Sequence, residues 1–178
     1  MDRYAKIGGL YFMTLNQAFF DELTSEAAIT RRCLERVPAE LFAWKPHDRS
    51  YSFGQLAAHI TEMFGWVPGI LETPELDLAA FPYTAFTPTT AEELLEAFDA
   101  NVNGALASIK DARPETFYDD WTMREGEKIY FTMPKAACLR SFILNHTIHH
   151  RGQLSGYLRS NDIPVPSIYG PSADEGVS

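Results

Sequence analysis

Four long runs of the chain place apolar residues three and four positions apart, the spacing that brings side chains onto one face of an α-helix. These runs cover residues 15–37, 52–65, 90–113 and 134–160. Each run can form a helix with one buried face, and a single bundle can bury all four faces together. A chain of 178 residues has the length of one domain with a sizeable core. We therefore expect an all-α fold, a four-helix bundle formed by one domain over residues 1–178.

Residues that start and stop helices mark the same runs. Ser52 followed by Gln55, and Thr90 followed by Glu93, are capping-box pairs that predict the first residues of the second and third helices. Proline interrupts helices because it has no backbone N–H to donate. Four prolines within residues 68–89 therefore predict a long irregular crossover between these two helices.

A different pattern, between residues 117 and 133, predicts a short β-hairpin before the last helix. Apolar and polar residues alternate on both sides of Glu125, Gly126 and Glu127, as in two strands joined by a turn. Pro134 then suits the first turn of the last helix. The Pro-rich C-terminal segment, NDIPVPSIYGPSADEGVS, contains several apolar residues, which indicate that it packs on the body of the domain.

The charge balance argues against one class of partner. The chain has 24 acidic and 15 basic side chains, a formal net charge of -9. Nucleic acids and anionic membranes are bound by clustered cations, so we expect neither partner. No apolar run has the roughly 18 residues of a membrane span, and the N-terminus lacks the pattern of a secretory signal. Two cysteines without a CxxC spacing, Cys33 and Cys138, fit a reducing compartment, and we expect a cytoplasmic protein.

The segment NHTIHHRGQL, in the last predicted helix, contains three of the five histidines. At about 100° per residue, His146 and His150 lie about 40° apart on one face of this helix. The apolar pattern predicts that this face is buried. Its other residues are Leu139, Ile143, Gln153 and Tyr157. His149 lies about 80° from the centre of the face, so the pair His146 and His150 is favoured over His146 and His149.

Buried imidazoles need partners, because an apolar core satisfies neither the donor nor the acceptor nitrogen of a neutral ring. A metal ion could bind one nitrogen of each ring, and His59, at the centre of the apolar face of the second helix, is the predicted third ligand. A lone buried histidine is more often a hydrogen-bonded core residue, so this prediction depends on the three occurring together. Three histidines with an open fourth position suit zinc or nickel better than magnesium or calcium.

Other polar residues near these positions have two interpretations each. Glu62 lies about 60° from His59 on the same helix, and it could support a ligand or act as a base, or be a solvated carboxylate. Gln153 could hydrogen-bond near the metal or simply pack. Arg151 lies off the predicted buried face, which indicates a surface or ion-paired side chain. His47, in a loop, is expected to be exposed to solvent.

The two histidine-containing parts of the chain resemble the DinB-like (DNA-damage-inducible) family of helical metalloproteins. The matching segments are PHDRSYSFGQLAAHITEM and NHTIHHRGQLSGYLRSNDIPVPSIYGPSADE, within a resemblance that covers most of the chain from about Trp44 onward. This family takes one metal ligand from the second helix and two from a His-x3-His pair on the last long helix, which correspond here to His59, His146 and His150. The resemblance also implies a four-helix bundle in up-down-down-up order, a homodimer, and bound nickel or zinc.

The wider superfamily includes bacillithiol-dependent S-transferases and mycothiol-dependent maleylpyruvate isomerases. This resemblance implies a small-molecule substrate and a low-molecular-weight thiol as co-substrate. It favours a metal-dependent transferase, in which the open position of the metal lowers the pKa of a bound thiol. The alternatives are a hydrolase that activates water, a non-catalytic metal-binding or regulatory protein, and a scaffold without a metal. The residues do not choose among them, because the irregular segments 66–89 and 117–133 show no legible substrate pocket.

Overall fold

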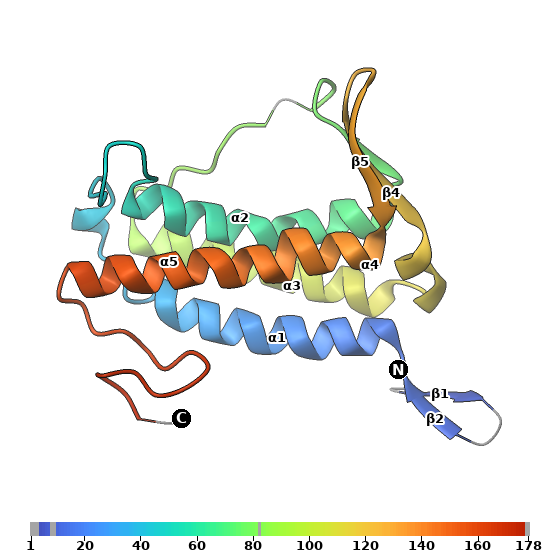
Figure 1. The fold of residues 1–178 in the computed structure, drawn as a ribbon, viewed down its shortest axis with the longest axis horizontal. Helices are drawn as coiled ribbons and strands as arrows, with labels where there is room; N and C mark the ends of the chain where they lie inside the picture. The colour runs from blue at the N-terminus through green and yellow to red at the C-terminus, as the bar shows by residue number, and fades with distance from the viewer. Residues whose placement is uncertain (1–3, 8–9, 82, 177–178) are drawn as a thin grey trace.

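The computed structural model describes residues 4–7, 10–81 and 83–176, and this part of the chain is mostly helical with a small three-stranded sheet (Figure 1). The helices are α1 (Leu15–Leu34), α2 (Phe53–Glu72), α3 (Ala91–Asp111), α4 (Lys135–Cys138) and α5 (His146–Ser160), and a π-helical segment (Leu139–Asn145) joins the last two. The strands are β1 (Tyr4–Ile7), β2 (Leu10–Met13), β3 (Glu75–Asp77), β4 (Asp120–Glu125) and β5 (Lys128–Pro134). The long helices lie alongside one another, with the sheet at one end and the β1–β2 hairpin projecting from the start of α1.

The starts of α2 and α3 confirm the capping predictions. At α2 both halves of the capping box form: Ser52 Oγ accepts from the backbone N–H of Gln55 at 3.2 Å, and Gln55 Oε1 accepts from that of Ser52 at 2.8 Å. At α3, Thr90 Oγ1 accepts from the backbone N–H of Glu93 at 3.1 Å. In a capping box the Glu93 carboxylate would accept from the backbone N–H of Thr90. Here it accepts from that of Thr89, one residue earlier, at 2.7 Å.

The predicted end of the second helix is wrong. α2 continues beyond Gly65 and through Pro68 to Glu72. Its apolar face does not stop at the proline, since Val67, Ile70 and Leu71 are all buried. Burial of these side chains offsets the backbone hydrogen bond that a proline inside a helix removes.

The crossover that follows is shorter than predicted and contains a strand. β3 pairs in parallel with β4, Leu76 lying opposite Met123. The predicted hairpin is confirmed: β4 and β5 are antiparallel, and Gly126 adopts a φ of +58° in the turn. From β3 the chain runs back over α2 to the start of α3 (Figure 1).

The last helix is less regular than its sequence suggested. The fully buried residues of α5 are Thr147, Arg151, Leu154 and Leu158. The predicted face with Gln153 and Tyr157 is therefore not the most buried one, and Gln153 is exposed. The π-helical segment just before α5 is the physical reason, because its wider turns take more residues and rotate the faces of the helix that follows.

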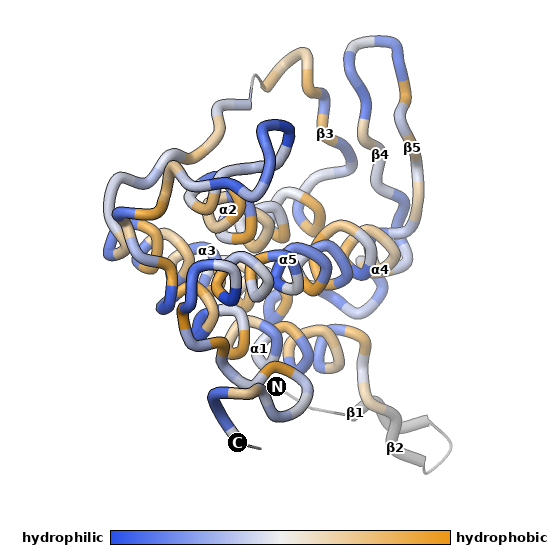
Figure 2. Tube along the Cα trace, turned by 60° about the vertical axis from the view of Figure 1, so that its left-hand side comes forward, coloured by the Kyte–Doolittle hydropathy of each residue, from blue (hydrophilic) through white to orange (hydrophobic). Residues whose placement is uncertain are grey.

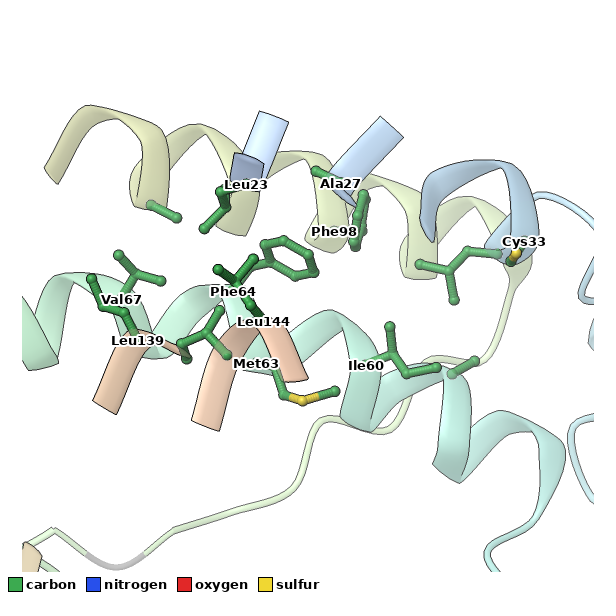
Figure 3. Close-up of a cluster of buried hydrophobic side chains, with 14 of the residues drawn as sticks. Leu23, Ala27, Cys33, Ile60, Met63, Phe64, Val67, Phe98, Leu139 and Leu144 are labelled. Atoms are coloured by element: carbon green, nitrogen blue, oxygen red, sulfur yellow. The ribbon is translucent and has the colours of Figure 1, made fainter. Parts of the chain in front are cut away.

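The core lies between the long helices. Leu23 and Ala27 of α1, Phe64 of α2, Phe98 of α3 and Leu144 of the π-helical segment gather there (Figure 3). Along each helix, hydrophobic residues recur between hydrophilic ones (Figure 2). No helix in the described ranges combines the length and apolar character needed to cross a membrane.

The C-terminal segment packs on the helices, as predicted. Arg32 of α1 donates to the backbone carbonyl of Ser167 at 2.6 Å, and Arg36 pairs with Glu175 at 2.7 Å. Apolar residues of the same segment contact the core. They are Ile163, Val165 and Ile168.

Candidate metal centre

Three histidine side chains converge between α2 and α5. The Nε2 atoms of His146 and His150 are 2.8 Å apart, and those of His59 and His146 are 3.5 Å apart. One nitrogen of each ring can be chosen so that all three lie within 4.8 Å of one another. In a tetrahedral zinc site with metal–nitrogen bonds of 2.0–2.1 Å, ligand nitrogens lie about 3.3 Å apart. The cluster therefore has close to the spacing that a metal ion requires.

A hydrogen bond on the far side of the His150 ring directs its other nitrogen toward the cluster. His150 Nδ1 lies 2.7 Å from Gln153 Oε1, an acceptor, so this contact places the proton of the ring on Nδ1. The Nε2 atom of His150 then presents a lone pair toward His146 Nε2, 2.8 Å away, and His59 Nε2 lies 3.5 Å from His146 Nε2. A cation held between these nitrogens would satisfy such lone pairs, so the residues present fit a metal ion.

The rings are held in the neutral form that binds metals. Burial, together with the nearby His150 and His146, lowers the pKa of His59 to about 4. Burial also lowers the pKa of His146 and of His150, with the Gln153 hydrogen bond opposing part of the shift at His150. Protons therefore compete weakly for these nitrogens at neutral pH.

The remaining histidines lie outside the cluster. His149 is exposed and its ring centroid is 4.9 Å from that of His150, but it is not part of the converging group. His47 is exposed, as expected. The structure thus brings together the three histidines selected from the sequence and separates them from the other two. Whether they bind a metal stays a prediction.

Glu62 and Gln153 have different surroundings. The Glu62 carboxylate accepts from Tyr83 Oη at 2.6 Å and from the backbone N–H of Phe86 at 2.8 Å, which holds the crossover on α2. Burial and Glu62 raise the pKa of Tyr83 to about 12, so the phenol remains a donor. Gln153 contacts His150 directly. Of the two residues, only Gln153 has a contact through which it can orient a ligand.

Two cavities flank the histidine cluster. A polar one of about 250 Å³ lies beside His150 and is also lined by Arg49, Tyr51 and Gln153. A more enclosed and mainly apolar one of about 150 Å³, here called the inner cavity, contacts His59 and His146. Its other lining residues are Met63, Trp66, Tyr83, Met123 and Phe142. These cavities could not be predicted from the sequence, because their walls depend on where the crossover and β4 pack against α2.

The protein's own thiols are not part of this site. Cys33 and Cys138 are both free and buried. Burial raises the pKa of each to about 11, so both remain protonated at neutral pH. A thiolate is the nucleophilic form of cysteine, and any thiol that reacts here must therefore come from outside the chain.

The fold and the histidine cluster define a helical protein with a possible three-histidine metal site. Residues 12–176 match the DinB family. The chain belongs to this family.

Individual relatives agree with the assignment. The uncharacterized protein YrdA of Bacillus subtilis is 27% identical over 164 residues, which cover 92% of this chain and 93% of YrdA. A crystal structure of a DinB-like protein from Bacillus cereus superposes with a TM-score of 0.66 at 20% identity, covering 88% of this chain and 98% of that one. The DinB-like protein YjoA of Bacillus subtilis gives a TM-score of 0.65 at 18% identity, covering 84% and 95%. These two structures show that the fold is shared.

Proposed function

We propose that the protein is a metal-dependent enzyme that transfers a low-molecular-weight thiol to a small electrophilic substrate. The single observation that carries this proposal is the convergence of three imidazole nitrogens, two of them only 2.8 Å apart. His59, His146 and His150 would hold nickel or zinc. When bound by three histidines, such an ion supplies an open coordination position that lowers the pKa of a thiol or a water molecule.

The chain's own residues have separate tasks in this proposal. Gln153 fixes the ring of His150 through Nδ1, so that its Nε2 faces that of His146. Arg49 lines the polar cavity beside His150 and is placed to attract an anionic group of a thiol. In the transfer the thiol loses its proton to solvent, its sulfur bonds to the electrophilic carbon, and the leaving group departs with the electron pair.

Cobalt substitution tests the proposal, because a thiolate bound to cobalt gives an intense near-ultraviolet absorption band. We expect the band when 2-mercaptoethanol is added to the cobalt-loaded protein, and its loss in His59→Ala. His47→Ala, which changes an exposed histidine outside the cluster, is the matched control and should keep the band. The same thiol should accelerate conjugation of 1-chloro-2,4-dinitrobenzene by wild type and not by His59→Ala.

One result would replace this proposal by the hydrolase alternative. A spectrum that thiols leave unchanged, together with hydrolysis of 4-nitrophenyl acetate that depends on His59, would assign the open position to water. Protein that binds cobalt but turns over neither kind of substrate would favour a non-catalytic metal-binding role.

A further inference from the structure

A second and larger apolar cavity shares two lining residues with the inner cavity. This outer cavity has a volume of about 440 Å³ and lies between α2, the crossover and β4. Trp66 and Tyr83 line both cavities. On β4, Trp121 lines the outer cavity and Met123 the inner one, and residues two apart on a strand point to the same side. The two cavities are therefore neighbours, and the inner one reaches His59 and His146.

The walls of the outer cavity select for an apolar, ring-containing ligand. Four aromatic side chains line it: Trp66, Phe81, Tyr83 and Trp121. None of the described residues that line it is a cation. Its one carboxylate, Glu75, already accepts from Arg124 at 2.6 and 2.9 Å. Aromatic walls with few polar groups are typical of sites that bind small apolar molecules.

One polar group on the wall has no partner. The indole Nε1–H of Trp121 is buried and makes no hydrogen bond within the described part of the chain. Buried donors without a partner are rare in proteins, since they lose their bonds to water. Because this nitrogen has almost no accessible surface, a ligand in the cavity meets the Trp121 ring rather than this donor.

A glycine on α2 leaves the cavity open. Gly69 lines the cavity, and a Cβ atom built on it has no atom within 4 Å. A side chain there would therefore extend into free space. Glycine is a poor residue for the interior of a helix. At this position α2 gives up helix stability, and the space beside it stays available to a ligand.

We propose that the outer cavity binds the aromatic part of the substrate while its reacting end lies in the inner cavity beside His59 and His146. This substrate class belongs to the proposed function, and the position of the reacting end rests on that function. Together the two cavities have the size of small-molecule sites. The substrate is thus expected to be a small molecule with an aromatic ring at one end and an electrophilic group at the other.

Gly69→Leu tests the cavity, because Gly69 lines it and a Cβ atom there has no protein atom within 4 Å, so the leucine side chain takes up free space beside the wall. Gly104→Leu on α3 is the matched control, since its Cβ also has no atom within 4 Å. The probes for the zinc-loaded proteins are acetohydroxamate, which has a metal-binding group alone, and 4-phenylbutanohydroxamate, which adds an aromatic tail. Calorimetry should show that the tail improves the dissociation constant at least about tenfold in wild type and Gly104→Leu, and not in Gly69→Leu. Acetohydroxamate should bind all three proteins equally.

A third probe separates this inference from the metal. 2-Naphthol has an aromatic ring and a hydroxyl group but no chelating group, and it should bind metal-free wild type and Gly104→Leu but not Gly69→Leu. Gly69→Ala, which adds one methyl group and favours the helix, should show an intermediate loss. If no hydroxamate binds while 2-naphthol still distinguishes the variants, the proposed metal function fails and the aromatic cavity stands. Equal binding of 2-naphthol, or an equal gain from the phenyl tail, in wild type and Gly69→Leu would overturn the inference.

Discussion

Two polar clusters lie on neighbouring faces of α5, and they satisfy their polar atoms in opposite ways. The histidine cluster, formed by His59, His146 and His150, joins α5 to α2. The arginine cluster joins α5 to α1 and to the C-terminal segment. It consists of Arg151, Glu26, Thr30 and Tyr169.

The charge of Arg151 is balanced within the arginine cluster. The Arg151 side chain is 1% exposed and pairs with Glu26 Oε2 at 2.6 Å. It also donates to the backbone carbonyl of Glu26 at 3.1 Å and to Thr30 Oγ1 at 3.0 Å, and Tyr169 Oη donates to Glu26 Oε2 at 2.8 Å. Among the described residues, the histidine cluster contains no carboxylate, and the Nε2 atoms of its rings face one another. A cluster whose charges are paired internally stabilises the fold, whereas a cluster of neutral imidazoles is suited to bind a cation.

Breaking the arginine cluster should have the largest effect on stability. Arg151→Met leaves the Glu26 carboxylate without its cation, and removing one partner of a buried ion pair costs about 3–5 kcal/mol. Urea denaturation of the metal-free protein should show this loss, while the metal content of the folded variant should not change. A loss below about 1 kcal/mol would contradict the distinction between the two clusters.

Removing the polar partner of the histidine cluster should affect metal binding instead of folding. Gln153→Leu deletes the acceptor of the His150 Nδ1 proton, and changes of this type typically reduce metal affinity about 10–100-fold. Gln153 is exposed, so the free energy of unfolding of the metal-free variant should stay within about 0.5 kcal/mol of wild type. Gln153→Glu keeps an acceptor oxygen and should retain most of the affinity. Competition with a chromophoric chelator measures both variants, and equal affinity of Gln153→Leu and wild type would show that the contact is incidental.

Acid should destabilise the metal-free protein through the histidine cluster. The pKa of His59 is lowered to about 4, so the unfolded chain binds more protons than the folded protein between pH 6.5 and 4. Stability that is present above pH 6.5 is therefore lost as the pH falls toward 4. The ring is only partly buried and solvent screens the effect, so we expect a loss of about 1–2 kcal/mol. Thermal denaturation from pH 7 to 4.5 should show that the stability of His59→Gln changes less steeply with pH than that of wild type. Identical pH dependence of the two proteins would show that His59 is not the cause.

Local signals predicted much of the helical structure. Ser52 and Thr90 start their helices because a hydroxyl group caps the free backbone N–H groups of the first turn, and this interaction involves only nearby residues. The spacing of His146 and His150 predicted a shared direction, since both lie within one regular turn of α5. His59 could be added because it lies on the inward-facing side of α2, which contacts α5.

The errors have non-local causes. Pro68 predicts a crossover because its missing N–H is a local property, whereas the buried neighbours that keep α2 intact contact other parts of the chain. β3 has only three residues and exists through its pairing with β4. Arg151 forms the ion pair that was one of its two predicted outcomes, and only its position off the buried face is wrong. The side chain is buried, because the π-helical segment turns it toward Glu26 of α1. The Glu62 contacts depend on the path of the crossover, which no local pattern defines.

Metal analysis of protein purified without added metal tests the central claim most directly. Wild type should contain close to one nickel or zinc ion per chain, and His146→Ala and His150→Ala should lose most of it. His149→Ala, which changes the neighbouring exposed histidine, should keep its metal. Removal of the metal by a chelator should also lower the melting temperature of wild type and of His149→Ala, because an ion bound only to the folded state stabilises it. Equal metal loss from His149→Ala and His150→Ala, or wild-type protein that binds no metal even when zinc and nickel are supplied, would contradict the account.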